Sequence, residues 1–591
     1  MTLVGGFLLW GVVGPQAVAA EPVGDPPEES GTTVSFTDDF EFRYWVDRDR
    51  RLPGYPDRAV YNYIEQVNRL TANVLAESWQ LDLQLDQVAL FANRYELGNE
   101  LIVEHPLVGE PGERLLFSPL PGDAYANLEK IRWTGTGERV EVKLGDSYVA
   151  FGRGLALNLN RNVDIDIDTS VQGVQVVARP GAWDLTAVVG QLNRQQVFQD
   201  NANGQIEDEV PRDMRHSLMA MRAERFGLGP ANVGAHTVAY GFVDEAGFEA
   251  SGEGFTDGPD VVIGGGTLEL IGVGGLDAYL EGDAFHYTPE GDLGDSSHGT
   301  HDGFFGGQAF YGSLAAYPGA LVVLLEGKRY RGTSPLADRT ARDEFYAVAT
   351  PPTLEYDRAI TIDSNAALAS NDITGARLRV DWSAVPGKFV PYLSTGYFVD
   401  RDLTHGLHTV PETIVHPLLG LEWLDGHRSV LFNAGYRVDD REGEQFGADR
   451  QTHADVVVQV PLVGETHLNM NVAGEYFVWG ENGSDLGETQ PEYVEFETSM
   501  TFAHGPDYAV TLFCDYTTQV PMNDKGNLFP GAFEGPERPL YGAMELQWKP
   551  DPATTIKAFY GAYKSGIRCA GGQCRLLPGF EGARLALQSA F

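Results

Sequence analysis

The sequence predicts an all-β protein, a transmembrane antiparallel up-and-down β-barrel of about 24 strands (roughly 22–26), with short periplasmic turns and long extracellular loops. Three observations predict this fold. Apolar and polar residues alternate along most of the chain, and the connections between the alternating segments are short and long in turn. In addition, no stretch after residue 21 holds the roughly 18 apolar residues that a membrane-spanning helix needs.

The alternating segments are the first element to justify, because a period of two is the signature of a strand with one apolar and one polar face. Residues 80–86 place three leucines on one face and acids and amides on the other. Residues 377–382, 493–497 and 544–549 repeat this pattern. We expect such strands to fill residues 33–591.

The connections fall into two alternating classes. The tight ones carry Pro, Gly and Asp, as at 179–181, 317–319 and 424–426, which is turn chemistry. The long ones are polar and often acidic, at about 47–58, 92–123, 153–168, 195–212, 245–258, 290–302, 333–371, 401–411, 439–449, 480–489, 519–536 and 564–577. Every long loop follows an odd strand, so the long loops gather at one end of the barrel and both chain termini lie at the other.

Composition narrows the class of protein further. The chain of 591 residues has 42 Lys and Arg against 84 Asp and Glu, for a net charge of −42. This balance excludes nucleic acid as a partner, because binding the phosphate backbone requires a basic surface. The 70 glycines, 30 phenylalanines and 25 tyrosines favour many short strands over helical bundles.

The N-terminal residues predict export from the cytoplasm. An apolar run over residues 3–13 precedes Ala17-Val18-Ala19, a small-residue pattern at which signal peptidases cleave. We therefore assign residues 1–20 to a signal peptide. Residues 21–32, rich in Pro and Glu, form a periplasmic tail ahead of the barrel at 33–591.

Two segments resemble Gram-negative outer-membrane barrel proteins. The chain ends in alternating apolar residues and a terminal aromatic ring, Leu585, Leu587 and Phe591, which resembles the β-signal that the barrel-assembly machinery recognises. Residues 145–155 (GDSYVAFGRGL) are similar to a stretch in large, porin-like and otherwise uncharacterised outer-membrane barrels. The resemblance implies a cell outer-membrane location, with outer-membrane lipid, lipopolysaccharide and the assembly machinery as partners.

The polar face of the strands should line the lumen. A barrel of about 24 strands is roughly 45–50 Å wide, so side chains cannot fill it, and loops 333–371 and 92–123 are candidates for folding inside. The predicted lumen-lining residues are mixed in sign with an acidic excess, which describes either a hydrated wall laced with ion pairs or a path that favours cations. They are Glu41, Arg43, Asp82, Asp86, Glu141, Lys143, Glu269, Asp277, Glu281, Asp283, Arg377, Arg379, Asp381, Glu495, Glu497 and Glu545.

Residues that could carry other chemistry are few. Cys569 and Cys574 bracket a Gly-Gly pair and are expected to form a small disulfide loop in an oxidising compartment. His298, His301 and Asp302 form a His/Asp cluster within one loop, which is the candidate metal site. No cofactor is expected beyond divalent cations held weakly by acidic loops, which could bridge lipopolysaccharide phosphates.

Two functions from different classes follow. The first is a large porin-like channel or transporter for polar solutes. The alternative is a structural or assembly barrel that anchors periplasmic or surface partners of a cell-envelope machine. An enzyme is not expected, because the sequence contains neither a nucleophile elbow nor an assignable Ser-His-Asp set.

Overall fold

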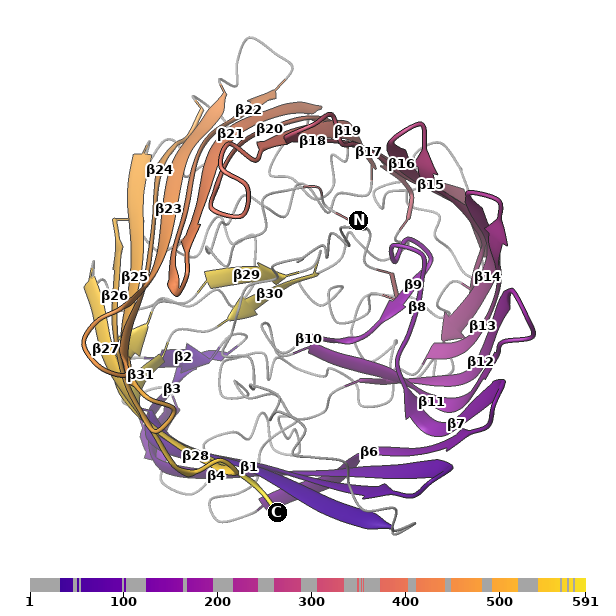
Figure 1. Cartoon of the computed structure of the whole chain (residues 1–591). Coiled ribbons are helices and arrows are strands. Elements are labelled where there is room, and N and C mark those ends of the chain that lie inside the picture. Colours follow the sequence, from indigo (N-terminus) through magenta and orange to yellow (C-terminus); the bar gives the residue numbers. More distant parts are fainter. Residues whose placement is uncertain are drawn as a thin grey trace.

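A computed structural model of the chain shows a ring of antiparallel strands around a wide lumen (Figure 1). The residues that it describes are 32–45, 50–52, 55–97, 100–102, 124–162, 167–194, 216–242, 260–288, 306–333, 348, 349, 352, 354, 372–401, 411–441, 448–480, 492–518, 540–563, 566–570, 573–577 and 580–591. The predicted signal peptide, 1–20, and nearly all of the tail, 21–32, lie outside them.

Twenty-four strands build the closed wall, which confirms the predicted fold and strand number. In chain order they are β1 (Thr33–Trp45), β3 (Tyr55–Leu75), β4 (Trp79–Leu97), β6 (Ala124–Thr136), β7 (Val140–Ser147), β11 (Ile167–Ala178), β12 (Trp183–Arg194), β13 (His216–Leu228), β14 (Ala231–Phe242), β15 (Asp260–Val273), β16 (Leu276–Thr288), β17 (Gly306–Ala316), β18 (Leu321–Arg331), β19 (Asp372–Trp382), β20 (Phe389–Asp400), β21 (Glu412–Asp425), β22 (Arg428–Arg441), β23 (Asp449–Pro461), β24 (Thr466–Val478), β25 (Glu492–His504), β26 (Tyr508–Thr517), β27 (Leu540–Asp551), β28 (Thr554–Tyr563) and β31 (Phe580–Ala590).

Seven shorter strands belong to the connections. Three of them, β2, β5 and β10, extend hairpins of the main sheet, whereas β8 with β9 and β29 with β30 form separate two-stranded sheets. They are β2 (Arg50–Leu52), β5 (Glu100–Ile102), β8 (Val149–Phe151), β9 (Leu157–Leu159), β10 (Arg161–Asn162), β29 (Gly566–Ala570) and β30 (Gln573–Leu577). Among the described residues there is no helix with the length and hydropathy needed to cross a bilayer.

The last strand closes the ring against the first. β31 pairs with β28 on one side and with β1 on the other, in a register that opposes Phe40 and Leu587. The backbones of Phe36 and Phe591 exchange two hydrogen bonds of 2.7 and 2.9 Å, and their rings stack at 5.7 Å between centroids. Closure leaves no unpaired sheet edge, as a barrel in hydrocarbon requires.

Connection lengths alternate around the ring as predicted. β21 and β22, for example, are joined by Gly426 and His427 alone, and Gly426 has a φ of 62°, a left-handed conformation that glycine adopts without a steric penalty. By contrast, β18 and β19 are separated by residues 332–371. The tight turns lie at one end of the barrel, the short-turn end, and the long loops at the other, the long-loop end.

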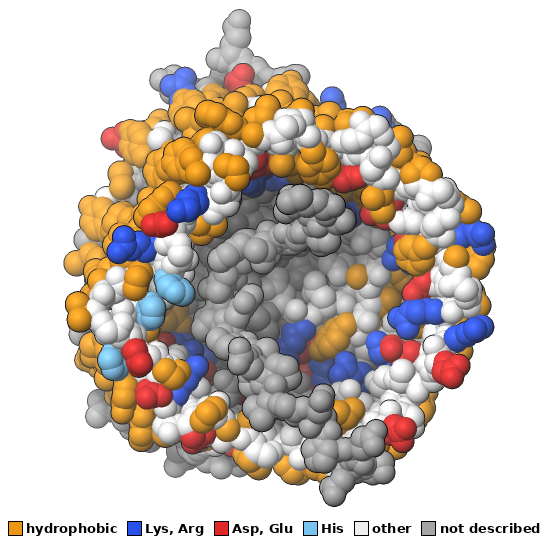
Figure 2. Space-filling view, viewed as in Figure 1, with side chains coloured by type: hydrophobic (Ala, Val, Ile, Leu, Met, Phe, Trp, Pro, Cys, Tyr) orange, Lys and Arg blue, Asp and Glu red, His pale blue; other side chains and the backbone are white. Residues whose placement is uncertain are grey.

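The outer face of the wall is apolar and exposed, whereas charged side chains gather around the inside (Figure 2). Outward aromatic side chains are exposed near both ends of the strands. Trp183, Trp382 and Trp548 lie toward the short-turn end, while Tyr397, Tyr436 and Tyr560 lie toward the long-loop end. Two aromatic belts around an apolar band are typical of a barrel that spans a membrane.

Candidate functional site: the lumen wall and an infolded segment

Residues 148–162, between β7 and β11, fold into the lumen, and we call them the infolded segment (Figure 1). Leu155, Ala156 and Leu157 have no exposed surface. β8 and β9 pair as a short hairpin whose turn contains Gly152 and Gly154, with φ of 56° and 86°. The segment begins at Tyr148, whose hydroxyl donates to Asp168 at 2.8 Å, and burial raises the pKa of this hydroxyl far above its ordinary value.

The infolded segment packs against apolar side chains on the inward face of β11–β21, which we call the inner-core wall. These side chains come mainly from the long-loop half of their strands, and they include Val238, Ile263, Phe285, Ile373, Phe398 and Ile414. In this half of the ring, the apolar cluster interrupts the paired polar groups of the lumen wall. Burial against the infolded segment explains why apolar residues occupy both faces of these strands.

Part of the long 333–371 connection joins the same core, as the sequence predicted for that loop. Val348 and Leu354 are buried in it. The backbone N–H of Asn158 donates to the carbonyl of Val348 at 2.8 Å, and the Tyr330 hydroxyl donates to the carbonyl of Pro352 at 2.9 Å. Most of the other candidate, 92–123, lies outside the described residues.

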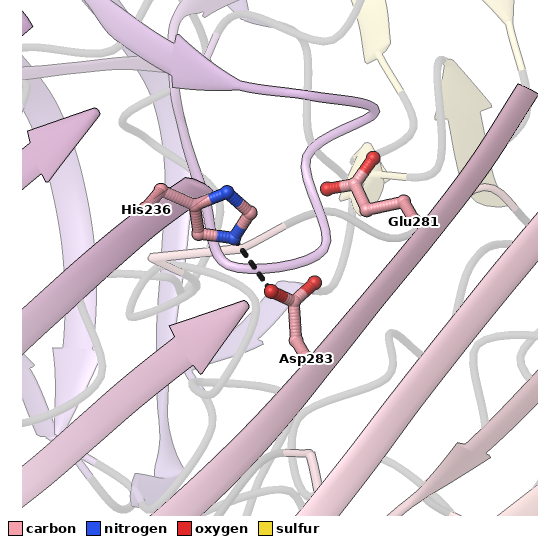
Figure 3. A group of neighbouring side chains, drawn as sticks. All are labelled: His236, Glu281 and Asp283. Carbon is pink, nitrogen blue, oxygen red and sulfur yellow. Dashed lines mark hydrogen bonds and ion pairs between the residues drawn. The ribbon is translucent and has the colours of Figure 1, made fainter. Parts of the chain in front are cut away.

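Next to this core, a polar cluster of His236, Glu281 and Asp283 lies on the inward face of β14 and β16 (Figure 3). The strand between them contributes no side chain at that level, because His236 pairs in register with Gly265 and Gly265 pairs with Asp283. The imidazole and the carboxylate therefore meet across the glycine, at 2.5 Å between His236 Nε2 and Asp283 Oδ1. Glu281 lies two residues before Asp283 on β16 and so shares its face.

The infolded segment contacts this cluster directly. The backbone N–H of Arg153 donates to Glu281 Oε2 at 2.7 Å, and the Tyr279 hydroxyl donates to the same oxygen at 2.5 Å. The ring of Phe151 lies 5.8 Å from that of His236. The cluster thus lies where the barrel wall and the infolded segment meet.

The opposite side of the lumen is lined mainly by paired polar groups. We call β22–β28, β31, β1, β3 and β4 the ion-pair wall. Arg69 binds Asp86 through three hydrogen bonds of 2.8–3.1 Å, and Asn433 donates to Asp455 at 2.9 Å. Gln451 donates to Glu475 at 2.6 Å. Aromatic rings such as those of Phe477 and Tyr493, stacked at 5.1 Å, lie between these pairs.

The sixteen predicted lumen-lining residues all lie on the face opposite the exposed apolar side chains, but they do not form one site. Most are paired locally. The ion pairs and hydrogen bonds that they form are Glu41–Arg43, Asp82–Arg132, Asp86–Arg69, Glu141–Lys143, Glu269–Asn232, Asp277–Tyr317, Asp283–His236, Arg377–Glu326, Arg379–Asp381, Glu495–Thr517 and Glu545–Arg584. Glu281 pairs as described above, and Glu497 is also engaged.

His236 is not among the residues predicted from the sequence, whereas Glu281 and Asp283 are. The signal that could have found it is the Gly264-Gly265-Gly266 run, since glycines in a strand mark a close approach of neighbouring groups. The predicted metal site at His298, His301 and Asp302 lies outside the described residues.

The structure shows the backbone positions of all three cysteines and the side chain of one of them, Cys514. Cys569 and Cys574 are paired in register across the β29–β30 hairpin, and their side chains lie outside the described residues. Cys514 is a free, exposed cysteine on the outward face of β26.

The segment that resembles a β-signal lies at the C-terminus of the barrel. Leu585 and Leu587 are on β31, Phe591 is the last residue, and Leu585 and Phe591 are exposed.

Comparisons with known proteins give likenesses of overall fold. No family model and no curated protein matches the sequence. Among solved structures, the P pilus usher (PapC) translocation pore aligns with a TM-score of 0.38 at 8% identity, covering 94% of this chain and 99% of that one. The copper transporter OprC aligns at 0.42 and 10% identity, covering 94% and 80%. The outer membrane protein OpdK from Pseudomonas aeruginosa aligns at 0.34 and 12% identity, covering 72% and 97%.

The class of protein follows from the molecule itself. A closed antiparallel wall, an apolar outer face between two aromatic belts and a charged inner face define a transmembrane β-barrel. The chain is an outer-membrane β-barrel protein.

Proposed function

We propose that the protein is a porin-like channel or transporter that passes polar solutes across the outer membrane and favours cations. The observation that carries this proposal is the sign of the charge on the inward face. Among the buried charged residues that the structure describes, fourteen are Asp or Glu and five are Lys or Arg. An excess of one sign along a low-dielectric wall raises the local concentration of ions of the opposite sign.

The ion-pair wall is the proposed side for permeation. Many of its inward groups are charged or amide side chains, and those that are partly exposed can exchange hydrogen bonds with a passing hydrated solute. The inner-core wall is covered in its long-loop half by the infolded segment and presents little polar surface there. Solutes would therefore move past partly exposed carboxylates such as Glu497 and Glu545 rather than past the apolar core.

Reversal potentials in planar bilayers test this proposal. With purified protein between unequal KCl solutions, the sign of the reversal potential should show a preference for K⁺ over Cl⁻. The double variant Glu269→Gln and Glu545→Gln should reduce that preference, because it removes two inward carboxylates that are only partly buried. Glu138→Gln, an exposed carboxylate in the tight turn between β6 and β7, is the matched control and should leave selectivity unchanged.

Two outcomes would overturn the proposal. A folded barrel that gives no conductance steps would favour the alternative function, a structural or assembly barrel that anchors other envelope components. A channel that prefers Cl⁻ would contradict the role assigned to the acidic excess.

A further inference from the structure

We propose that His236, Glu281 and Asp283 bind one divalent transition-metal ion, of the Zn²⁺ class, at the junction between the barrel wall and the infolded segment. This inference does not rest on the proposed channel function. It concerns side chains of the barrel wall on β14 and β16, not the His298 loop that follows β16 in the chain.

The donor set is the first argument. One imidazole nitrogen and two carboxylate oxygens, one atom from each residue, lie within 4.8 Å of one another, and all three residues are buried. Zn²⁺ and its neighbours bind nitrogen and oxygen ligands at about 2.0–2.2 Å. Small rotations of side chains already this close would bring the three donor atoms around one ion.

Unpartnered atoms are the second argument. His236 Nδ1, Glu281 Oε1 and Asp283 Oδ2 are all buried without a hydrogen-bond partner. The side chains of His236 and Asp283 have no exposed surface, and Glu281 is 3% exposed. Buried polar atoms nearly always have a partner, so three such atoms in one cluster require an explanation.

Charge is the third argument. Within the part of the chain that the structure describes, neither Glu281 nor Asp283 forms an ion pair with a Lys or Arg. Their hydrogen bonds come from an imidazole, a phenol hydroxyl and a backbone N–H. Two carboxylates buried without a compensating cation are costly, and a divalent ion would supply the missing positive charge.

Two glycines provide the room that the site needs. A Cβ on Gly265 would lie 1.7 Å from Asp283 Oδ1, and a Cβ on Gly152 would lie 2.3 Å from either oxygen of Glu281. Gly265 belongs to the wall and Gly152 to the infolded segment. Any other residue at either place would displace a proposed ligand.

The site would attach the infolded segment to the wall. Glu281 Oε2 already accepts from the backbone of Arg153, which leaves Oε1 for the ion. An ion held there would fix the Glu281 carboxylate and, through it, the turn at Gly152 and Arg153. This is the usual relation between a metal ligand and the hydrogen bonds that orient it.

Metal analysis of the purified full-length protein tests the proposal. After extraction from outer membranes without chelator and exposure to Zn²⁺ followed by desalting, the wild type should hold about one ion per chain. Co²⁺ substituted for Zn²⁺ should give visible absorption bands from a site with nitrogen and oxygen ligands. Asp283→Asn and His236→Asn should each lower retained metal at least about tenfold, because each removes one ligand.

Glu326→Gln is the matched control. Glu326 is also a buried carboxylate on the inner-core wall, but it is satisfied by the Tyr311 hydroxyl and Arg377. This variant should keep the metal. Heat-modifiable migration on gels reports whether each variant has folded, and only folded protein enters the comparison.

Three outcomes would overturn the proposal. If the wild type retains no Zn²⁺ and shows no Co²⁺ bands, the cluster does not bind a metal, and a proton shared among its side chains takes the place of the ion. Metal that persists in folded Asp283→Asn and His236→Asn would lie elsewhere. Metal lost equally in Glu326→Gln would show that the effect is not specific to the cluster.

Discussion

The inner-core wall and the ion-pair wall are built from the same alternating strands, yet their inward faces differ in the long-loop half. Inward positions of the first include a continuous apolar cluster, as at Ile263 and Phe398, whereas those of the second are mainly charged or amide, as at Arg437 and Gln451. In the short-turn half both walls carry polar pairs, such as Glu269–Asn232 on the first and Asn73–Asp82 on the second. The difference follows from what covers each wall, since only the first lies against the infolded segment.

This comparison shows that a barrel wall can serve as one layer of an ordinary hydrophobic core. The 24-strand ladder stabilises itself through backbone hydrogen bonds. Among the described residues, the infolded segment is held by its apolar side chains and a few polar contacts. Substitutions can therefore separate the stability of the segment from that of the wall.

The largest effect should come from the centre of the inner core. Leu157→Asp would bury a carboxylate where the side chain has no exposed surface, at a cost of about 3–5 kcal/mol. We expect the infolded segment to leave the wall while the barrel remains folded. In an Ala156→Cys background, a thiol reagent should label the thiol introduced at position 156 only when Leu157→Asp is also present. Heat-modifiable migration should be retained.

Labelling of Ala156→Cys alone would show that the segment is mobile in the wild type. Loss of heat-modifiable migration in the double variant would show that the wall needs the segment in order to fold. Either result would contradict the separation of the two layers.

The next effect should distinguish the outer from the inner face. Leu546 is exposed on the outward face of β27, whereas Gln547 lies on the inward face. Leu546→Arg should destabilise the inserted barrel by about 2–4 kcal/mol, because a cation in hydrocarbon is unsolvated, while Gln547→Arg should have an effect near zero. The folded fraction recovered in detergent or lipid, measured by heat-modifiable migration, checks this, and equal losses would contradict the assigned faces.

A smaller effect is expected in the ion-pair wall. Arg584 and Glu545 are joined at 3.0 Å with side chains 27% and 15% exposed. Because water reaches this pair, Glu545→Gln should lower the free energy of unfolding by no more than about 1 kcal/mol. Denaturant unfolding in lipid measures this free energy. A decrease as large as that caused by Leu157→Asp would contradict the distinction between the apolar core and the water-accessible ion pairs.

Strand number, the faces of the strands and the sorting of connections could all be predicted, because each depends on local pattern. The alternation at 80–86 and the glycine at 426 act within one hairpin. The sequence predicts infolding of the 333–371 connection, but that residues 148–162 enter the lumen could not be predicted, because they contain alternating apolar residues that would also suit a wall strand. Only the apolar inward faces of distant strands decide where these residues pack.

The His236 cluster could not be predicted for a related reason. Glu281 and Asp283 follow from alternation on one strand, but His236 joins them through the register of three strands, with Gly265 in between. Register depends on the tight turn between β15 and β16 and on pairing along the whole length of β14, β15 and β16. The sequence therefore predicts the inward face of Glu281 and Asp283 but not that His236 lies beside them.

The smallest effect on the barrel should come from the cysteine pair, which lies outside both walls. Cys569 and Cys574 are paired in register on β29 and β30, and directly opposed residues of an antiparallel pair lie at about 4.5–5.5 Å between Cα atoms, within the range of a disulfide. A bridge across so short a loop would stabilise the hairpin by at most a few kcal/mol. Cys569→Ser should leave the melting of the barrel unchanged, because the hairpin pairs only with itself.

Thiol labelling of intact cells tests the bond and the placement of this loop together. Cys569 and Cys574 should react with an impermeant reagent only after reduction, since an oxidising compartment keeps the bond formed. Cys514 provides an internal comparison, because its side chain points outward from β26 into the membrane and should label poorly with or without reductant. Labelling of the pair without reductant would exclude the disulfide, and labelling only after the outer membrane is permeabilised would place the hairpin at the periplasmic end.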